Sequence, residues 1–289
     1  MKRLDITEKI FKILSYVLLT IFALACLYPF WYILMNSISS KSATSLMNIN
    51  FLPDTLNVSA YLYVFEQKAF WLSYCNSFFV TMYGTLVSML VGICGAYALS
   101  KSRLLFGRGF NFMLVFTMWF NAGMIPTYNN FHRFNVTNIY MFIIALGFNA
   151  FNIILLRNYF SSISSEIEEA ATIDGATEFQ ILSRIYIPMS KSSIVTVAMF
   201  YAVSRWNGYI WAQMLLEPED YPLTVYIRNS VESLINKWVE DPSLAEKFNF
   251  SEYSARYAFL VCSIIPIIVI YPKLQKYFAA GVNVGGVKE

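Results

Sequence analysis

The sequence has little charge for its length. Only 13% of its 289 residues are Asp, Glu, Lys or Arg, against about 25% in ordinary soluble domains. Hydrophobic residues make up 57% of the chain, and its mean hydropathy is +0.50. Because a soluble protein of this size needs a charged surface that this chain cannot supply, the composition excludes an ordinary soluble domain and predicts a membrane protein.

Side chains that carry out catalysis or hold metals are also scarce. The four cysteines are scattered without the spacing of a disulfide framework or a metal site, and the single histidine, His132, falls in an expected outer loop. No HExxH motif occurs, and none of the long apolar stretches contains Asp or Glu. These absences argue against an intramembrane enzyme and against a proton-coupled transporter, which commonly places ionisable relay residues in its spans.

Six apolar stretches are candidates for crossing a bilayer. A spanning helix needs roughly 20 mostly apolar residues. The fifth stretch reaches that length only if Arg205 is accepted inside it, and the short sixth is flanked by basic residues that can extend to the interfaces. The stretches cover residues 13–40, 69–100, 109–131, 134–156, 192–216 and 257–272. They predict an all-α membrane protein with about six transmembrane helices.

The distribution of Lys and Arg predicts the orientation of the chain. Basic residues concentrate before the first stretch, between the second and third, between the fourth and fifth, and after the sixth. By the positive-inside rule these segments and both termini are cytoplasmic. We therefore divide the chain into an N-terminal helix with an outer loop (1–68), a five-helix core (69–275) and a cytoplasmic tail (276–289). The core includes an inner loop at 158–188 and an acidic outer loop at 216–254, which is either a solvated loop or a docking surface for an external partner.

The inner loop carries clear signals of helix ends. Ser165 with Glu168 three residues later has the pattern of a capping box, which predicts a helix start. Gly175 is suited to the left-handed residue that ends such a helix. Thr177 with Gln180 offers a second capping box, so a second helix is expected to run to the end of the loop.

The surface of this helix pair combines small side chains with a carboxylate. Ala170, Ala171 and Ala176 would let another protein approach the backbone closely, and Glu169 could meet a cation there. The residues alone leave two interpretations open, a knob that inserts into a partner or an amphipathic connector that lies on the membrane.

The same residues resemble the EAA loop of permease subunits of ATP-binding-cassette (ABC) importers. That pattern is E-A-A, three residues, G, nine residues and I-x-L-P. This chain has Glu169-Ala170-Ala171, Gly175, Ile185 and Ile187-Pro188, with Ile187 in place of Leu as the one departure.

The resemblance implies the type I ABC importer permease fold, in which this loop forms a coupling helix that docks in a groove of the ATPase subunit. Glu169 would pair with a basic residue of the ATPase, and Gly175 would allow the turn. The implied ATPase-coupling residues are Glu169, Ala170, Ala171, Asp174, Gly175, Ile185, Ile187 and Pro188. The chain itself has no G-x-x-x-x-G-K-[ST] nucleotide-binding loop, so it is expected to be a non-catalytic subunit without a cofactor or metal.

The likeness extends over most of the chain. The pair Trp206-Asn207 and the tail Gly285-Gly286-Val287-Lys288 are similar to the carbohydrate-uptake branch of these permeases (maltose-permease-like). This implies a multi-pass protein of the bacterial cytoplasmic membrane that forms a heterodimer with a second homologous permease. Two ATPase subunits would hold ATP and Mg²⁺ inside, where the tail also contacts them, and an extracytoplasmic binding protein would deliver an oligosaccharide. No nucleic-acid partner is expected.

Polar and aromatic side chains in or near the expected spans are candidates for the substrate pathway, because amides pair with sugar hydroxyls and flat rings stack on sugar rings. The set is Asn76, Trp119, Asn121, Tyr128, Asn149, Asn152, Arg205, Trp206, Asn207 and Tyr209. Each can instead join helices or sit at a membrane interface.

Arg205 allows three interpretations. It extends outward to the interface, pairs with an acid of the partner permease, or faces an anionic sugar. The identity, charge, length and linkage of the sugar stay open, as do two alternatives, an ion-coupled secondary sugar transporter and an ABC permease for a non-sugar solute.

Overall fold

The computed structural model describes residues 6–45, 51–240 and 247–282, and every regular element in these ranges is helical. The chain divides into two compact units. The first contains residues 1–68 and 227–265, and the second contains residues 69–226 and 266–289. The tail residues Val287 and Lys288, predicted to contact the ATPase, lie outside the described residues.

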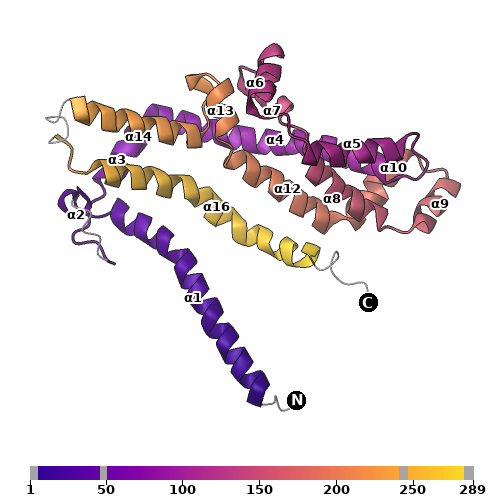
Figure 1. Cartoon of the computed structure of the whole chain (residues 1–289), viewed down its shortest axis with the longest axis horizontal. Coiled ribbons are helices and arrows are strands. Elements are labelled where there is room, and N and C mark those ends of the chain that lie inside the picture. The colour runs from indigo at the N-terminus through magenta and orange to yellow at the C-terminus, as the bar shows by residue number, and fades with distance from the viewer. Residues whose placement is uncertain (1–5, 46–50, 241–246, 283–289) are drawn as a thin grey trace. The chain divides into compact units, whose positions relative to one another are not determined.

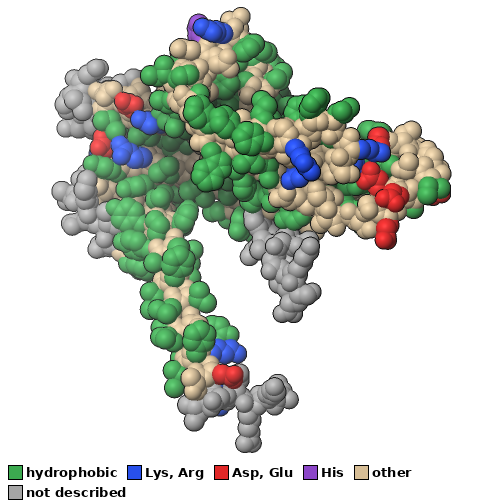
Figure 2. Space-filling model, turned by 45° about the vertical axis from the view of Figure 1, so that its right-hand side comes forward, with side chains coloured by type: hydrophobic (Ala, Val, Ile, Leu, Met, Phe, Trp, Pro, Cys, Tyr) green, Lys and Arg blue, Asp and Glu red, His purple; other side chains and the backbone are tan. Residues whose placement is uncertain are grey.

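The first unit contains α1 (Ile6–Ser37), α2 (Lys41–Ser45) and α3 (Ser59–Glu66) together with parts of α14 (Leu223–Glu240) and α16 (Glu252–Val282). A buried hydroxyl cluster joins α2 to the start of α16. The Ser251 hydroxyl donates to Thr44 Oγ1 at 2.8 Å, and Thr44 Oγ1 lies 3.0 Å from Ser254 Oγ. Hydrophobic side chains cover α1 along its length (Figure 2), and most of them, such as Leu18, are exposed in this single chain.

The second unit carries most of the candidate functional residues. Figure 1 shows α9 and α10 at one end of this unit, beside the ends of α5 and α8, while α6, α7 and α13 gather away from that end. Its elements are α4 (Lys68–Ser100), α5 (Gly107–Trp119), α6 (Met124–Arg133), α7 (Ile139–Ala145), α8 (Ala150–Ser161), α9 (Ser165–Ile173), α10 (Glu178–Ile181), the π-helical turn η1 (Leu182–Tyr186), α11 (Ile187–Met189), α12 (Lys191–Trp206), α13 (Ile210–Leu215) and η2 (Pro218–Asp220).

Among the described residues of the second unit, two apolar clusters hold its helices together. The first buries Ala96 of α4, Leu156 of α8, Val197 of α12 and Ile181 of α10, so the inner loop shares a core with three helices. The second buries Val80 and other apolar residues of α4, α7 and α13. Burying each large apolar side chain contributes about 1.5–3 kcal/mol where water is the alternative. The inner loop is therefore anchored rather than loosely attached.

Within the described residues, three helices are long and apolar enough to cross a membrane, namely Thr7–Ser37, Lys68–Ser100 and Glu252–Pro272. A fourth candidate is the pair Ile139–Ala145 and Ala150–Ser161, which is bent by 52°. These agree with the first, second, sixth and fourth expected spans. The prediction of about six spans and of cytoplasmic termini goes beyond these helices and stays a prediction.

The third and fifth expected spans are not continuous helices. Residues 109–131 are divided between α5 and α6, and residues 192–216 between α12 and α13. The first break contains Gly123 at φ 91°, and the second contains Asn207-Gly208. Hydropathy cannot reveal such breaks, because a charge-free stretch stays apolar when its helix is interrupted. Interrupted backbone is tolerated at membrane depth where it is buried in protein or lines a cavity.

Candidate functional site

The inner loop forms a helical hairpin made of α9 and the segment α10–η1–α11. Ser164 is the N-cap of α9, where its hydroxyl accepts a hydrogen bond from the Glu166 N–H at 3.3 Å. The predicted capping box of Ser165 with Glu168 is therefore wrong, since the cap lies one residue earlier and Glu168 has other partners. The expected helix start itself is correct.

The turn and the second helix start follow the sequence prediction. Gly175 has φ 79°, a left-handed conformation that costs a side-chain-bearing residue about 1 kcal/mol. Thr177 Oγ1 accepts from the Gln180 N–H at 3.4 Å, and the Thr177 N–H donates to Gln180 Oε1 at 2.8 Å. The second capping box is confirmed, and it sets the direction in which α10 leaves the turn.

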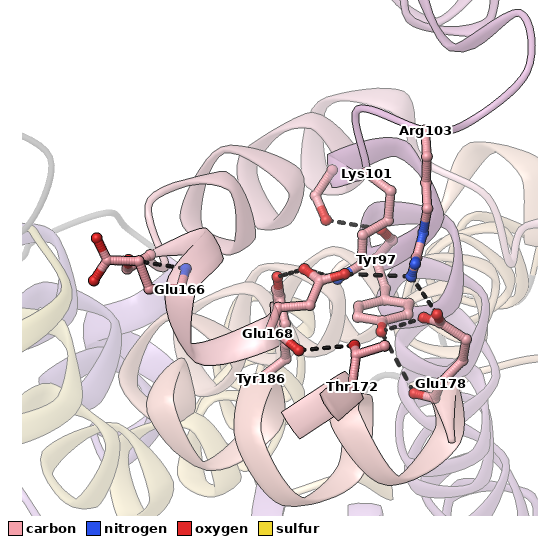
Figure 3. A network of polar contacts seen from close by, with 10 residues as sticks. Tyr97, Lys101, Arg103, Glu166, Glu168, Thr172, Glu178 and Tyr186 are labelled. Carbon is pink, nitrogen blue, oxygen red and sulfur yellow. Dashed lines mark hydrogen bonds and ion pairs between the residues drawn. The ribbon is translucent and has the colours of Figure 1, made fainter. Parts of the chain in front are cut away.

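An ionic network ties α9 to the end of α4 (Figure 3). The carboxylate of Glu168 accepts hydrogen bonds from Lys101 Nζ at 2.6 Å, the Tyr186 hydroxyl at 2.7 Å and Arg103 Nη2 at 3.3 Å. Arg103 also pairs with Glu178, and the Tyr97 hydroxyl donates to Glu178 Oε2 at 2.7 Å. Residues from the α4–α5 connection, α9 and α10–η1 are thus joined by charge-assisted hydrogen bonds.

Lys101 is the buried centre of this network. Only 9% of its side chain is exposed, and its ammonium group lies 4.1 and 4.0 Å from the ring centroids of Tyr97 and Tyr186. Two aromatic faces and one carboxylate therefore surround the charge. By contrast, the Arg103–Glu178 pair has more than half of each side chain exposed and contributes little, because solvent screens it.

The network keeps Glu168 ionised. Burial by itself raises the pKa of this carboxyl, but the hydrogen bonds from Lys101 and Tyr186 and the charges of Lys101 and Arg103 outweigh burial, so the pKa lies below its usual value. Burial and the hydrogen bond to Glu168 raise the pKa of the Tyr186 hydroxyl, which stays a protonated donor at neutral pH.

Sequence reasoning missed this network. Lys101 and Arg103 are among the basic residues between the second and third apolar stretches, which indicated only the orientation of the chain, and Glu168 was expected to cap a helix. No local pattern could have found the contacts, because Glu168 lies 67 residues from Lys101 and 65 from Arg103 in the chain.

The predicted coupling residues fall into two groups. Glu169, Ala170, Asp174, Gly175 and Pro188 are exposed. Ala171, Ile185 and Ile187 are half-buried and pack against the core cluster that contains Leu156. Figure 2 shows acidic side chains gathered at the end of the unit that α9 forms. The hairpin therefore has an anchored side, which contains Ala171, Ile185 and Ile187, and a free side, which contains the five exposed residues.

Two large apolar side chains extend the free side. Ile173 is 86% exposed and Phe179 is 76% exposed, on either side of the Gly175 turn. Exposed side chains of this size, beside small residues and a carboxylate, are typical of a surface that another protein covers.

The breaks in two helix pairs open a cavity in the second unit. It has a volume of about 770 Å³ and lies at the bend between α7 and α8 and at the break between α12 and α13. Of the ten residues predicted for the substrate pathway, it is lined by Asn149, Asn152, Arg205, Asn207 and Tyr209. Asn149 caps α8 by accepting the Asn152 N–H at 3.0 Å, so the first turn of α8 opens on the cavity.

The other five predicted residues lie elsewhere. Trp206 is buried with its ring against Tyr74, and Asn76 Nδ2 donates to the carbonyls of Glu219 and Tyr221. Asn121 Oδ1 accepts the Gly123 N–H in the turn between α5 and α6. The remaining two are Trp119, which is 87% exposed at the end of α5, and Tyr128, which packs against the apolar cluster that contains Val80.

Arg205 is buried at the edge of the cavity with only 8% of the residue exposed. Its Nη2 donates to Ser88 Oγ at 3.1 Å and to the Leu146 carbonyl. Gly84 of α4 makes room for it, because a Cβ at that position would lie 3.1 Å from Arg205 Nε. The second terminal nitrogen, Nη1, has no hydrogen-bond partner among the described residues.

Residues 1–284 match the family of binding-protein-dependent transport system inner membrane components. The chain belongs to this family. The membership confirms the resemblance inferred from the EAA loop, the permease fold and the location in the cytoplasmic membrane. It also makes the chain a component of a transport system.

Close relatives and a solved structure cover nearly the whole chain. It is 34% identical over 283 residues to the polygalacturonan/rhamnogalacturonan transport system permease protein YtcP of Bacillus subtilis (strain 168), which covers 97% of this chain and 99% of the relative. Protein LplC of the same strain is 33% identical over 265 residues, with 90% and 88% covered. A crystal structure of a bacterial ABC transporter involved in the import of the acidic polysaccharide alginate contains a chain with 42% identity and a TM-score of 0.86, covering 96% of this chain and all of that one.

Proposed function

We propose that this protein is one permease subunit of an ATP-driven, binding-protein-dependent importer of an acidic oligosaccharide. The observation that carries the proposal is the α9–α10 hairpin. Its free side presents Glu169, Ala170 and Gly175, while its other side is anchored in the core and clamped to α4 through Glu168. A protruding element that is rigidly tied to spanning helices is what mechanical coupling to a second protein requires.

In this mechanism the permease makes and breaks no covalent bonds. Two ATPase subunits bind and hydrolyse Mg-ATP inside, and their closure displaces the hairpin as a lever. The Glu168–Lys101 contact passes the displacement to α4, and the shared core passes it to α8 and α12. These helices line or flank the cavity, so its access switches between the two sides of the membrane. A second homologous permease completes the pathway, and an extracytoplasmic binding protein delivers the substrate.

Two relatives support the acidic substrate class. One is a permease for polygalacturonan and rhamnogalacturonan, and the other belongs to an importer of the acidic polysaccharide alginate. Within this chain, the cavity offers an arginine, three asparagines and several aromatic rings, which suits sugars that carry both hydroxyls and carboxylates.

The test of this function is a charge reversal on the free side of the hairpin. In the complex assembled in liposomes, with substrate-loaded binding protein, Glu169→Lys is expected to lower stimulated ATPase activity at least about tenfold, because like charges facing each other at an interface cost several kcal/mol. The measurement is the ATPase rate with and without loaded binding protein, together with assembly of the four membrane-associated subunits.

Glu166→Lys is the matched control. Glu166 is also exposed on α9 but lies outside the EAA pattern, so its reversal is expected to leave stimulation unchanged. If the chain recruits no ATPase, or if both reversals are equally harmless, the hairpin is only a connector and the proposed coupling is wrong.

A further inference from the structure

The buried guanidinium of Arg205 has no negative partner among the residues that the structure describes. None of the residues that line the cavity is Asp or Glu, and no ion pair of Arg205 occurs within the described ranges. Its Nη2 is held by the neutral oxygens of Ser88 and Leu146, which orients the group without neutralising it. A buried charge without a counter-charge is unfavourable, so proteins retain one where function uses it.

The guanidinium lies at the wall of the cavity. Nη1 is itself buried and has no hydrogen-bond partner among the described residues, and Arg205 is one of the residues that line the cavity of about 770 Å³. The interpretation in which Arg205 extends outward to the membrane interface is therefore wrong, because the side chain is buried against Gly84 and Ser88 of α4.

A second source of positive potential opens on the same cavity. Asn149 and Asn152 in the first turn of α8 are among its lining residues. The Asn152 N–H is already bonded to Asn149 Oδ1, but the helix dipole still places partial positive charge at this end of α8. An unneutralised guanidinium and a helix N-terminus thus favour an anion in one cavity.

We propose that Arg205 binds a carboxylate of the transported sugar, with its guanidinium donating to a carboxylate oxygen. The occupant is a uronate residue of an oligosaccharide, because the cavity also carries the aromatic side chains Phe148, Tyr209 and Trp211, which can cover the apolar face of a sugar ring. The inference rests on the proposed function and adds to it the residue that selects for acidic sugars.

The experiment compares a galacturonate oligosaccharide with the same oligosaccharide after its carboxyl groups have been reduced to alcohols. Binding of each to the purified complex is measured directly, without binding protein, and uptake of each is measured in proteoliposomes. Arg205→Gln is expected to weaken binding of the acidic sugar about tenfold to hundredfold, the usual loss for one charge-assisted hydrogen bond. Binding of the neutral sugar should not change.

Two further variants keep the test decisive. Arg205→Lys retains the charge and is expected to preserve part of the acidic binding. Arg133 is exposed on α6 and is not among the residues that line the cavity. Arg133→Gln should therefore bind both sugars as the wild type does. Stimulation of the ATPase by loaded binding protein reports whether the Arg205 variants are folded and assembled.

The outcomes separate this inference from the proposed function. If wild type imports the acidic sugar and Arg205→Gln binds it equally well, or loses both sugars equally, the carboxylate site is refuted while the importer stands. Pairing of Arg205 with an acid of the second permease would give that equal loss. If wild type imports neither sugar, the proposed function itself fails.

Discussion

Two neighbouring carboxylates on α9 have different environments. Successive helix residues point about 100° apart. Glu168 therefore faces α4 and accepts hydrogen bonds from Lys101 and Tyr186, while Glu169 is exposed on the free side of the hairpin. One residue holds the hairpin to its own chain, and the next is available to another protein. The proposed coupling needs both roles, an internal contact at Glu168 and an external contact at Glu169.

Neutralising the inward carboxylate should loosen the hairpin. Glu168→Gln leaves the buried Lys101 ammonium without a counter-charge, although the rings of Tyr97 and Tyr186 still face it. We expect the local free energy of opening to fall by about 2 kcal/mol, less than the full cost of a broken buried pair. Amide hydrogen exchange in α9 should then speed up roughly thirtyfold.

Glu178→Gln is the matched control for that prediction. Glu178 pairs with Arg103 where both side chains are more than half exposed, and the glutamine keeps an oxygen that can accept from the Tyr97 hydroxyl. Loss of the charge should therefore cost less than about 1 kcal/mol. Equal acceleration of exchange in the two variants would contradict a special role for Glu168.

Glu168 also makes the stability of the hairpin depend on pH in the acidic range. The pKa of Glu168 is lower in the folded protein than its usual value, which is about 4.3. Its contribution to stability is thus fully present above the unfolded pKa and is lost as the pH falls through the folded pKa. The difference in melting temperature between wild type and Glu168→Gln should stay constant from about pH 7 to 5 and narrow below about pH 4.

At the scale of elements, the close approach of α4 and α12 positions the arginine. Gly84 lies where a Cβ would be 3.1 Å from Arg205 Nε and 3.3 Å from its Cδ. The backbone of α4 therefore shapes the channel in which the Arg205 side chain runs. The breaks after α7 and α12 have a related effect, because they turn two helix ends toward the cavity.

Adding one methyl group to α4 should disturb this arrangement. Gly84→Ala forces Arg205 to shift by a few tenths of an ångström, which misplaces its hydrogen bonds to Ser88 and Leu146. We expect uptake of an acidic oligosaccharide to fall several-fold while the complex still assembles. Gly95→Ala is the control, because its Cβ would meet only Ile153 Cγ2 at 3.9 Å. Similar losses in both variants would point to general packing of α4 instead.

At the scale of the whole molecule, the energy source separates the proposed importer from an ion-coupled secondary transporter. Uptake in cells or vesicles should stop when ATP is depleted and should continue when an uncoupler collapses the proton gradient. Coupling through the hairpin predicts this result, because the chain offers no Asp or Glu in its expected spans as a proton relay. Uptake that is lost with the uncoupler at constant ATP would refute ATP-driven transport.

The sequence by itself determined the properties that depend on short spacings. Hydropathy located the apolar stretches, and cap residues located the hairpin. Gly175 marked its turn and the spacing from Glu169 to Pro188 identified the family. These signals span about 20 residues or fewer, within which local sterics and backbone hydrogen bonding decide the conformation.

Only the tertiary structure decided what lies together across the chain. It divided three apolar stretches into broken helices, and it brought five of ten candidate pathway residues to one cavity. It also joined Glu168 to Lys101 and placed Arg205 against Ser88, 117 residues away in the chain. The physical reason is that packing sets these contacts. Side-chain shape across the whole unit, rather than any local pattern, decides which faces of α4, α8 and α12 meet.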